Sequence, residues 1–254
     1  MMFFVLLIAF ASAIPDPTHL KCKDLFYNSF IPDGMLSTDT GLCKNDSLAM
    51  SYNGDLLNPS WTAHFLTAKE AHSAQGGRRS FMQDEDLAAL GVHQVSSDDK
   101  IFSEKWTRGH LAPSRDMSYD KSTNGPWYNA YKMSNIAVQT GVFNTGSWNN
   151  LETNIFNWIN SNNQDLYIVT GTMLKDKNNP NRMNGITVPD YYFKIICDPT
   201  HKQSAGFYGR NTQDNTDHLP SMVSVHEIEG MFGGNLMDTA CNTDTVDSSH
   251  WNFK

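Results

Sequence analysis

Four cysteines, Cys22, Cys43, Cys197 and Cys241, place the strongest constraint on the fold of this 254-residue chain. Their number is even and no two have the CxxC spacing of a zinc site, so the sequence favours disulfides over free thiols or a metal centre. Four cysteines allow three connectivities, and the sequence does not choose among them. Pairing by proximity joins Cys22 to Cys43 and Cys197 to Cys241, which would fasten the two ends of the chain separately.

The first thirteen residues have the pattern of a secretory signal peptide. An apolar run over residues 3–10 precedes Ala11-Ser12-Ala13, a small-x-small cleavage pattern. The segment contains no Lys or Arg, and a buried N-terminal strand is the alternative interpretation. We expect residues 1–13 to be removed and the mature protein to be secreted and extracellular, where cysteines are oxidised. No other stretch approaches the ~18 apolar residues of a membrane span, so no membrane partner is expected.

Composition narrows the class of protein further. With 39% hydrophobic residues the chain can bury a sizeable core, which excludes intrinsic disorder. The 19 Lys and Arg against 27 Asp and Glu give a net charge of −8, so a polyanion would have to bind through a local patch. No linker divides the mature chain, and we expect an N-terminal extension over 18–57 and one domain over 58–254.

The hydrophobic pattern predicts a mixture of strands and helices in no regular βαβ order. This mixture indicates an α+β fold, a single domain with a central antiparallel sheet flanked by helices. The predicted strands cover 58–65, 166–171, 188–197 and 204–208, the last two joined as a hairpin. The predicted helices cover 84–91, 144–158 and 223–236, the last stopped by Gly230 or by Gly233-Gly234, and 175–187 is expected to be an exposed loop.

Three segments carry side chains that are candidates for a catalytic or binding site. They are Arg108-Gly109-His110 within 106–117, Ser134-Asn135-Ile136 within 133–139, and the stretch from Asn144 to Glu152. The imidazole of His110 can accept a proton from water near neutral pH. One amide oxygen can hold a hard, strongly hydrated cation such as Mg²⁺. Arginine side chains can bind phosphate oxygens bidentately.

Together these segments resemble the DNA/RNA non-specific endonuclease family, which includes endonuclease G and secreted sugar-non-specific nucleases. The family pattern is Asp-Arg-Gly-His-x-x-Pro, then Ser-Asn-Ile-x-x-Gln, then Asn-x-Gly-x-Trp-x-x-x-Glu, and here it begins with Thr-Arg-Gly-His. The resemblance covers roughly residues 58–236. It implies a ββα-metal (His-Me finger) active-site motif and an endonuclease that hydrolyses DNA and/or RNA with little sequence specificity.

The resemblance implies a role for each candidate in the cation site. His110 is the general base, Asn144 is the protein ligand of Mg²⁺, with Mn²⁺ as the alternative ion, and Glu152 acts through the water around the cation. Because Glu152 lies eight residues beyond Asn144, about 12 Å along a regular helix, joint direct ligation is not expected. The plainer alternatives make Asn144 a helix N-cap and Glu152 a solvated helix residue.

Three further residues are candidate substrate contacts. Arg108 and Arg79, or the neighbouring Arg78, are expected to bind phosphate, and Asn135 is expected to orient the site or the substrate. The alternatives are a surface charge pair for Arg78 and Arg79 and an ordinary structural amide for Asn135.

Two positions depart from the family pattern. Thr107 replaces an Asp, which keeps a hydrogen-bonding oxygen but removes a charge, and Phe156 stands where some relatives carry a further active-site Arg. A nuclease-fold protein that binds extracellular nucleic acid with little or no turnover is therefore the competing hypothesis. The sequence leaves open the preference for DNA or RNA, for single or double strands, and the oligomeric state, including a homodimer.

Overall fold

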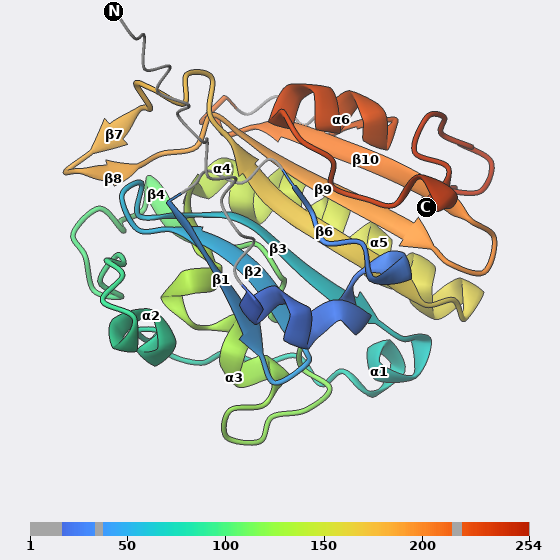
Figure 1. The fold of residues 1–254 in the computed structure, drawn as a ribbon, viewed down its shortest axis with the longest axis horizontal. Coiled ribbons are helices and arrows are strands. Elements are labelled where there is room, and N and C mark those ends of the chain that lie inside the picture. The colour runs from blue at the N-terminus through green and yellow to red at the C-terminus, as the bar shows by residue number, and fades with distance from the viewer. Residues whose placement is uncertain (1–16, 34–37, 215–219, 254) are drawn as a thin grey trace, which may run out of the picture.

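The computed structural model describes residues 17–33, 38–214 and 220–253, so the expected signal peptide lies outside the described residues (Figure 1). Among the described residues, seven strands form one sheet in the order β1-β2-β3-β6-β9-β10-β11, and every pairing between them is antiparallel. These strands are β1 (Asp39–Lys44), β2 (Leu48–Asn53), β3 (Asn58–Leu66), β6 (Leu166–Met173), β9 (Tyr191–Asp198), β10 (Gln203–Arg210) and β11 (Ser221–Val223). The predicted α+β architecture around an antiparallel sheet is confirmed.

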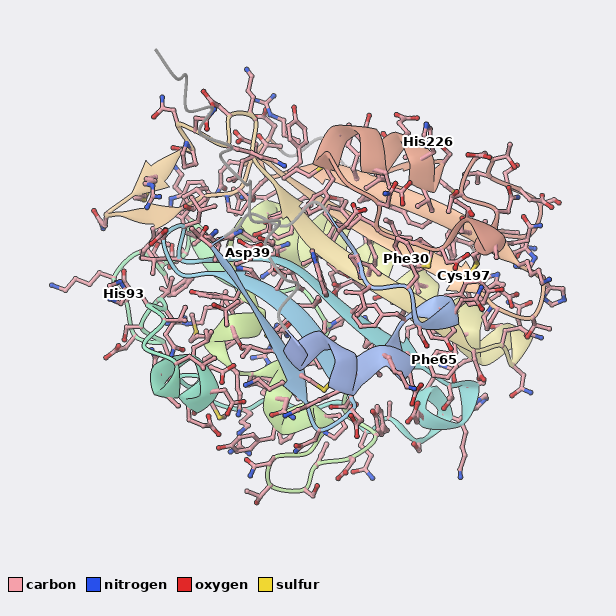
Figure 2. All side chains as sticks on the ribbon, viewed as in Figure 1. Phe30, Asp39, Phe65, His93, Cys197 and His226 are labelled. Carbon is pink, nitrogen blue, oxygen red and sulfur yellow. A yellow bond between two sulfur atoms is a disulfide. The ribbon has the colours of Figure 1, made fainter. Side chains whose placement is uncertain are left out.

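Helices cover both faces of this sheet (Figure 1). The α-helices are α1 (Ala68–Ser73), α2 (Glu85–Ala89), α3 (Pro126–Ala130), α4 (Gly141–Phe143), α5 (Asn149–Asn162) and α6 (Val225–Phe232). The other helical turns are η1 (Pro17–Leu25), η2 (Tyr27–Ser29), η3 (Met133–Asn135), η4 (Asn144–Trp148) and η5 (Thr239–Cys241). One core packs η1 and α6 against the sheet and includes Phe65 and Cys197 (Figure 2). A second core packs α1, α5 and the C-terminal Trp251 against the other face.

Local signals explain where several helices begin and end. Ser224 caps α6 by accepting a hydrogen bond from the backbone of Glu227, and Gly233 ends it with a left-handed φ of 86°. The predicted stop at the Gly233-Gly234 pair is therefore confirmed in preference to Gly230. Asp84 caps α2 in the same way, at the position where the sequence predicted a short helix.

Two predicted boundaries and one predicted loop differ from the structure. The helix predicted from residue 144 is regular from Asn149, because Gly146 in η4 has a non-helical backbone with φ −99° and ψ −113°. The strand predicted from residue 188 begins at Tyr191 as β9. The expected exposed loop over 175–187 contains a small hairpin of β7 (Arg182–Met183) and β8 (Ile186–Thr187), in which Ile186 is buried.

A separate two-stranded sheet lies beside α5. It pairs β4 (Trp106–His110) with β5 (Ile136–Thr140) in antiparallel register, so that Thr107 faces Gln139 and His110 faces Ile136. Residues between the two strands include α3 and η3, and β5 leads through α4 and η4 into α5. This strand, strand and helix arrangement brings the three sequence motifs into one unit.

The segment expected to be an N-terminal extension contributes to the main sheet. Strands β1 and β2 pair with each other, and β2 pairs with β3 across the expected boundary at residue 57. Among the described residues, no helix combines the length and the apolar character needed to cross a membrane.

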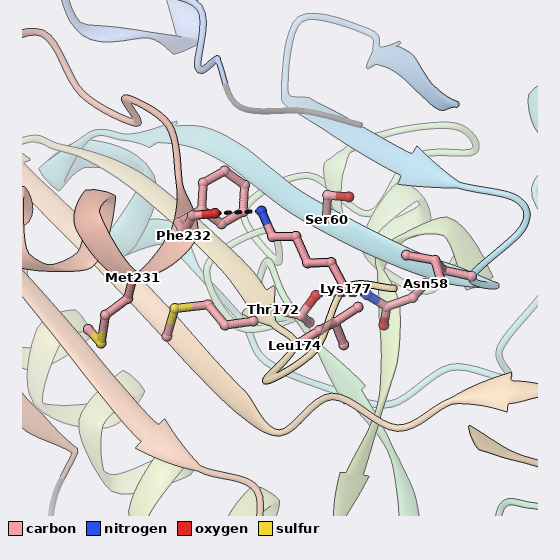
Figure 3. A pocket seen from close by; sticks show the side chains of 9 residues that line it. Asn58, Ser60, Thr172, Leu174, Lys177, Met231 and Phe232 are labelled. Atoms are coloured by element: carbon pink, nitrogen blue, oxygen red, sulfur yellow. Dashed lines mark hydrogen bonds between the residues drawn. The ribbon is translucent and has the colours of Figure 1, made fainter. Parts of the chain in front are cut away.

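A small cavity of about 40 Å³ lies between the end of β6 and α6 (Figure 3). The side chain of Lys177 reaches across it and donates a hydrogen bond of 2.7 Å to the carbonyl oxygen of Phe232. Asn58 and Thr172 also line this cavity and bond to each other at 2.7 Å. None of the candidate catalytic residues lines this cavity.

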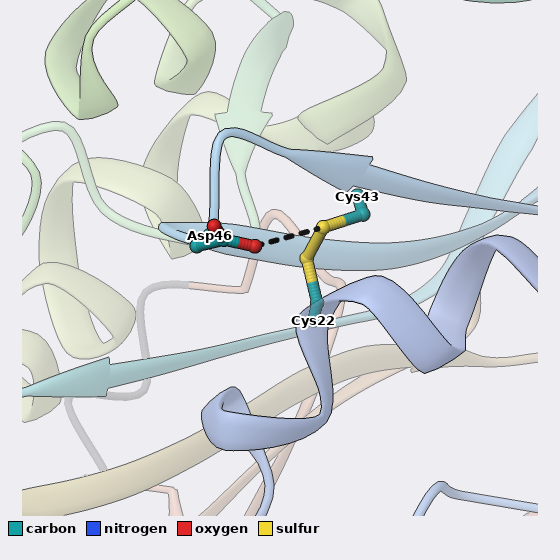
Figure 4. A group of neighbouring side chains, drawn as sticks. All are labelled: Cys22, Cys43 and Asp46. Atoms are coloured by element: carbon teal, nitrogen blue, oxygen red, sulfur yellow. Dashed lines mark hydrogen bonds between the residues drawn. A yellow bond between two sulfur atoms is a disulfide. The ribbon is translucent and has the colours of Figure 1, made fainter.

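Both disulfides expected from proximity are present. Cys22 joins Cys43, which ties η1 to β1, and Asp46 lies beside this bond (Figure 4). Cys197 joins Cys241, which ties β9 to η5 near the C-terminus. Because the sulfur atoms of Cys22 and Cys43 are bonded to each other, their proximity to Asp46 does not form a metal site.

Replacement of Gly171 by Ala should destabilise the sheet. A Cβ atom on Gly171 would lie 2.5 Å from the carbonyl oxygen of Ser60 on the neighbouring strand and would also clash with Phe193. We expect Gly171→Ala to lower the free energy of unfolding by about 1–3 kcal/mol, measured by urea denaturation with the disulfides intact. The matched control is Gly230→Ala in α6, where a Cβ would meet no atom within 4 Å, and where the free energy should rise by up to about 1 kcal/mol. Equal effects of the two substitutions would contradict this account.

Candidate functional site

The structure brings three of the predicted residues into one cleft. His110 from the end of β4, Asn144 from η4 and Glu152 from α5 line an open cleft of about 350 Å³. The remaining lining residues are Pro113, Ser114, Arg115, Asn149 and Thr153. The non-helical backbone at Gly146 separates Asn144 from the regular part of α5, so the predicted spacing of 12 Å along one helix axis does not apply.

The imidazole of His110 is held by aromatic rings rather than by hydrogen bonds. The rings of Phe81 and Tyr131 lie with centroids 5.3 Å and 5.0 Å from it. Its Nε2 atom is buried and has no hydrogen-bond partner among the described residues. Burial lowers the pKa of His110 to about 4, so the ring is neutral at physiological pH and can accept a proton.

The side chain of Asn144 is positioned by Thr107, one of the two residues that depart from the family pattern. The Nδ2 atom of Asn144 donates a hydrogen bond of 2.9 Å to Oγ1 of Thr107, and that hydroxyl donates to the carbonyl oxygen of Gln139. The side-chain amide oxygen of Asn144, Oδ1, then has no hydrogen-bond partner among the described residues and remains available to a ligand. Asn144 has helical backbone angles and lies at the C-terminal end of α4 and the start of η4, whose N-cap is Phe143, so the N-cap alternative was wrong.

Glu152 is a buried carboxyl group, and the alternative of a solvated helix residue was wrong. Burial raises its pKa to about 7, although the ammonium of Lys194, 3.8 Å from Oε1, acts in the opposite direction. Oε1 has no hydrogen-bond partner among the described residues. Glu152 can therefore change its ionisation near neutral pH or interact with a cation in the cleft.

Lys194 supports this carboxyl group from within the core, a role that was not predicted. Its ammonium donates to Oγ1 of Thr170 at 2.5 Å and to the carbonyl oxygen of Leu111 at 3.4 Å. Burial lowers the pKa of Lys194, and the nearby carboxylates of Glu152 and Asp116 oppose that shift. Asp116 in turn lies 3.3 Å from Nε2 of His64. A line of buried polar groups thus lies behind the cleft.

Asn135 lies in the interior rather than in the cleft. It is fully buried, and its side chain accepts from the backbone of Ala112 at 2.9 Å and donates to the carbonyl oxygens of Ala112 and Ala130. This is the geometry of a structural amide, which fixes the segment following His110.

The two predicted arginines lie outside the cleft but close to His110 through aromatic rings. Arg108 packs against Phe81, the ring that also contacts His110, and donates from Nε to the carbonyl oxygen of Ser97 at 2.9 Å. Arg79 is exposed, with its guanidinium 4.2 Å from the ring centroid of Tyr128. Neither forms an ion pair within the described residues.

A third arginine lines the cleft itself. Arg115 donates to Oγ1 of Thr153 at 2.9 Å, and its guanidinium lies 5.2 Å from the ring centroid of Phe156. Position 156, where some relatives carry an arginine, is thus occupied by an aromatic ring that contacts Arg115. The contact between Arg115 and Phe156 was not predicted, because the two residues lie far apart in the sequence and no motif links them.

The donor set in the cleft suits a hard divalent cation. Asn144 offers an amide oxygen and Glu152 a buried carboxylate oxygen without a hydrogen bond, and oxygen atoms are the ligands that Mg²⁺ and Mn²⁺ prefer. The neutral, unpartnered nitrogen of His110 lies in the same cleft.

Comparisons with known proteins identify similar sequences and a similar fold. The chain is 26% identical to the mitochondrial nuclease EXOG of Danio rerio over 126 residues, which are 50% of this chain and 35% of that protein. This chain thus matches about a third of that relative's length. A chain in the crystal structure of the EndoG/EndoGI complex has the same fold, with a TM-score of 0.63 at 19% identity, over 87% of this chain and 91% of that one.

The sequence profile of the DNA/RNA non-specific endonuclease family matches residues 28–246, so the predicted family is confirmed. This chain belongs to the DNA/RNA non-specific endonuclease family.

Proposed function

We propose that this protein is a secreted, metal-dependent endonuclease that hydrolyses phosphodiester bonds of DNA and/or RNA with little sequence specificity. Its family supports the activity of a nuclease. The observation that carries the proposal is the shared cleft, in which an unpartnered neutral imidazole, a free amide oxygen and a buried carboxyl group lie together.

The side chains of the cleft have distinct roles in this proposal. His110 accepts a proton from the attacking water, because burial keeps its ring neutral above about pH 4. Asn144 holds Mg²⁺, with Mn²⁺ as the alternative, through the oxygen that its bond to Thr107 leaves available. The cation, when bound, neutralises charge that develops on the phosphate and the leaving oxygen. Glu152 in its ionised form attracts and orients the hydrated ion.

Arginines and aromatic rings around the cleft account for binding without sequence readout. Arg115 lines the cleft, and Arg108 lies over the ring of Phe81, which contacts His110. Arg79 lies over the ring of Trp127, which in turn contacts Tyr131. Guanidinium groups bind phosphate oxygens, which are the same at every nucleotide. This local set of cations offsets the overall charge of −8 where the substrate would bind.

Secretion is the remaining part of the proposal. The signal-like pattern at residues 1–13 supports it, as do two disulfides, which persist in oxidising compartments.

Replacement of His110 by Ala should abolish hydrolysis while leaving nucleic-acid binding intact. Loss of a general base typically lowers the rate about 10²–10⁴-fold. The assay is Mg²⁺-dependent digestion of one duplex DNA and one RNA, with a gel shift in the presence of a chelator as the measure of binding.

His93→Ala is the matched control, because His93 is an exposed histidine away from the cleft (Figure 2). Retention of more than about half the activity in His110→Ala would remove His110 from the mechanism. A wild-type protein that shifts both substrates without digesting them would favour the binding-only alternative.

The hydroxyl of Thr107 should be needed to present Asn144 to the cation. Thr107→Val keeps the shape but removes the acceptor for Nδ2 of Asn144, so we expect Mg²⁺ affinity and activity to fall about 10-fold. Thr107→Ser keeps the acceptor and should remain close to the wild type. Calorimetric titration with Mg²⁺ and steady-state kinetics measure the two effects. Equal affinities in the Val and Ser variants would show that the bond to Asn144 plays no part in cation binding.

Mg²⁺ affinity should rise with pH through about 7. Burial raises the pKa of Glu152 to about 7, so below that pH its carboxyl group is protonated and lacks the charge that attracts a cation. His110, with a pKa of about 4, stays neutral over this range. Well below pH 7, affinity should change about 10-fold for each pH unit, and Glu152→Gln should abolish the dependence. Titration calorimetry between about pH 5.5 and 8 tests this, and an unchanged pH profile in Glu152→Gln would contradict it.

A further inference from the structure

A second group of ligand-type side chains lies at the far end of α5 from the cleft. Asp198 ends β9, His201 lies in the turn between β9 and β10, and His250 belongs to the C-terminal segment. A ligand atom from each of the three lies within 4.8 Å of the other two. None of these residues belongs to the sequence motifs of the nuclease cleft.

The spacing of these atoms suits one small cation. Oδ2 of Asp198 lies 2.7 Å from Nδ1 of His201 and 3.1 Å from Nε2 of His250. Ligand atoms bound to Zn²⁺ at about 2.1 Å in a tetrahedron lie about 3.4 Å from one another. To admit an ion, Oδ2 of Asp198 would therefore need to move away by about 0.3 Å from Nε2 of His250 and by about 0.7 Å from Nδ1 of His201.

Asp198 and His250 are held in place by their surroundings. Asp198 is fully buried, and its other carboxylate oxygen accepts from the backbone of Thr200 at 2.8 Å and of His201 at 3.2 Å. The carbonyl oxygen of His250 accepts from Nε1 of Trp158 on α5 at 3.1 Å. These contacts present Oδ2 of Asp198 to both imidazoles before any ion is bound.

One nitrogen of the group has no hydrogen bond. Nε2 of His250 is buried, and although it lies 3.1 Å from Oδ2 of Asp198, it has no hydrogen-bond partner among the described residues. A buried polar atom without a partner carries a cost that a bound ion would remove. Nδ1 of His201 becomes a ligand when its ring carries the proton on Nε2 instead, which the exposure of half of that side chain permits.

An adjoining cavity leaves room for a fourth ligand. It has a volume of about 290 Å³ and is lined by His201 and His250 together with Gln164, Ser249 and Asn252. Two imidazoles and one carboxylate form a ligand set that binds Zn²⁺ in preference to Mg²⁺. A water molecule in the cavity would be the fourth ligand.

We propose that Asp198, His201 and His250 bind a Zn²⁺ ion that fastens the C-terminal segment to the β9–β10 turn. The site is separate from the nuclease cleft and differs from it in metal preference. It supplements the disulfide between Cys197 and Cys241, which joins the same two parts of the chain.

The test is calorimetric titration of the full-length secreted form with Zn²⁺, in the presence of excess Mg²⁺ and after removal of bound metal with a chelator. We expect one equivalent of Zn²⁺ whose affinity falls about 10-fold or more in His201→Ala and in His250→Ala. Zn²⁺ should raise the Tm of the wild type, and this rise should be lost in both variants. The visible spectrum of the Co²⁺-substituted protein should show tetrahedral bands that are also lost.

Two controls make the outcome decisive. His226→Ala replaces an exposed histidine on α6 and should keep the full Zn²⁺ effect (Figure 2). Asn144→Ala alters the nuclease cleft and should also keep it. Because the side chain of His201 is 51% exposed, His201→Ala should fold normally even if His250→Ala does not. Absence of Zn²⁺ binding in the wild type, or equal Zn²⁺ affinity in His201→Ala and His226→Ala, would overturn the proposal.

Discussion

The geometry of the nuclease cleft depends on the buried amide of Asn135. Its side chain bonds to both backbone groups of Ala112 and to the carbonyl oxygen of Ala130, and its own carbonyl oxygen accepts from Leu111. One residue thus joins the segment after β4 to the end of α3 and the start of β5. Because a buried donor or acceptor left unpaired costs about 1–3 kcal/mol, these bonds hold His110 against the rings of Phe81 and Tyr131.

The elements that sequence predicted best are those with a strong local pattern. The apolar spacing that predicts α5 and the glycine that ends α6 each depend on residues close together in the sequence. The structure contains both the helix and the stop at Gly233. Strand β4 shows no alternation of buried and exposed residues, so periodicity alone did not reveal it. The break at Gly146 was also not predicted, because the apolar spacing of the helix continues across it and shows no interruption there.

The site residues that could be predicted are those that belong to a linear sequence motif. His110, Asn144 and Glu152 come from such motifs and share the cleft. The supporting residues come from elsewhere in the chain, as with Lys194 behind Glu152 and Arg115 on the ring of Phe156. Spacing along the chain does not encode contacts of this kind. A position that departs from the family, such as Thr107 or Phe156, can be understood once its spatial neighbour is known.

Helix α5 connects the nuclease cleft with the C-terminal segment. Glu152 and Thr153 face the cleft, and about one and a half turns further along, the ring of Trp158 lies with its centroid 4.8 Å from that of the buried Trp251. The stretch after the second disulfide therefore forms part of the packing that keeps this helix in place. Local unfolding that released the tail would expose the apolar side of α5 to solvent, so protection of its amide hydrogens from exchange, and its resistance to proteases, should depend on whether the tail is docked.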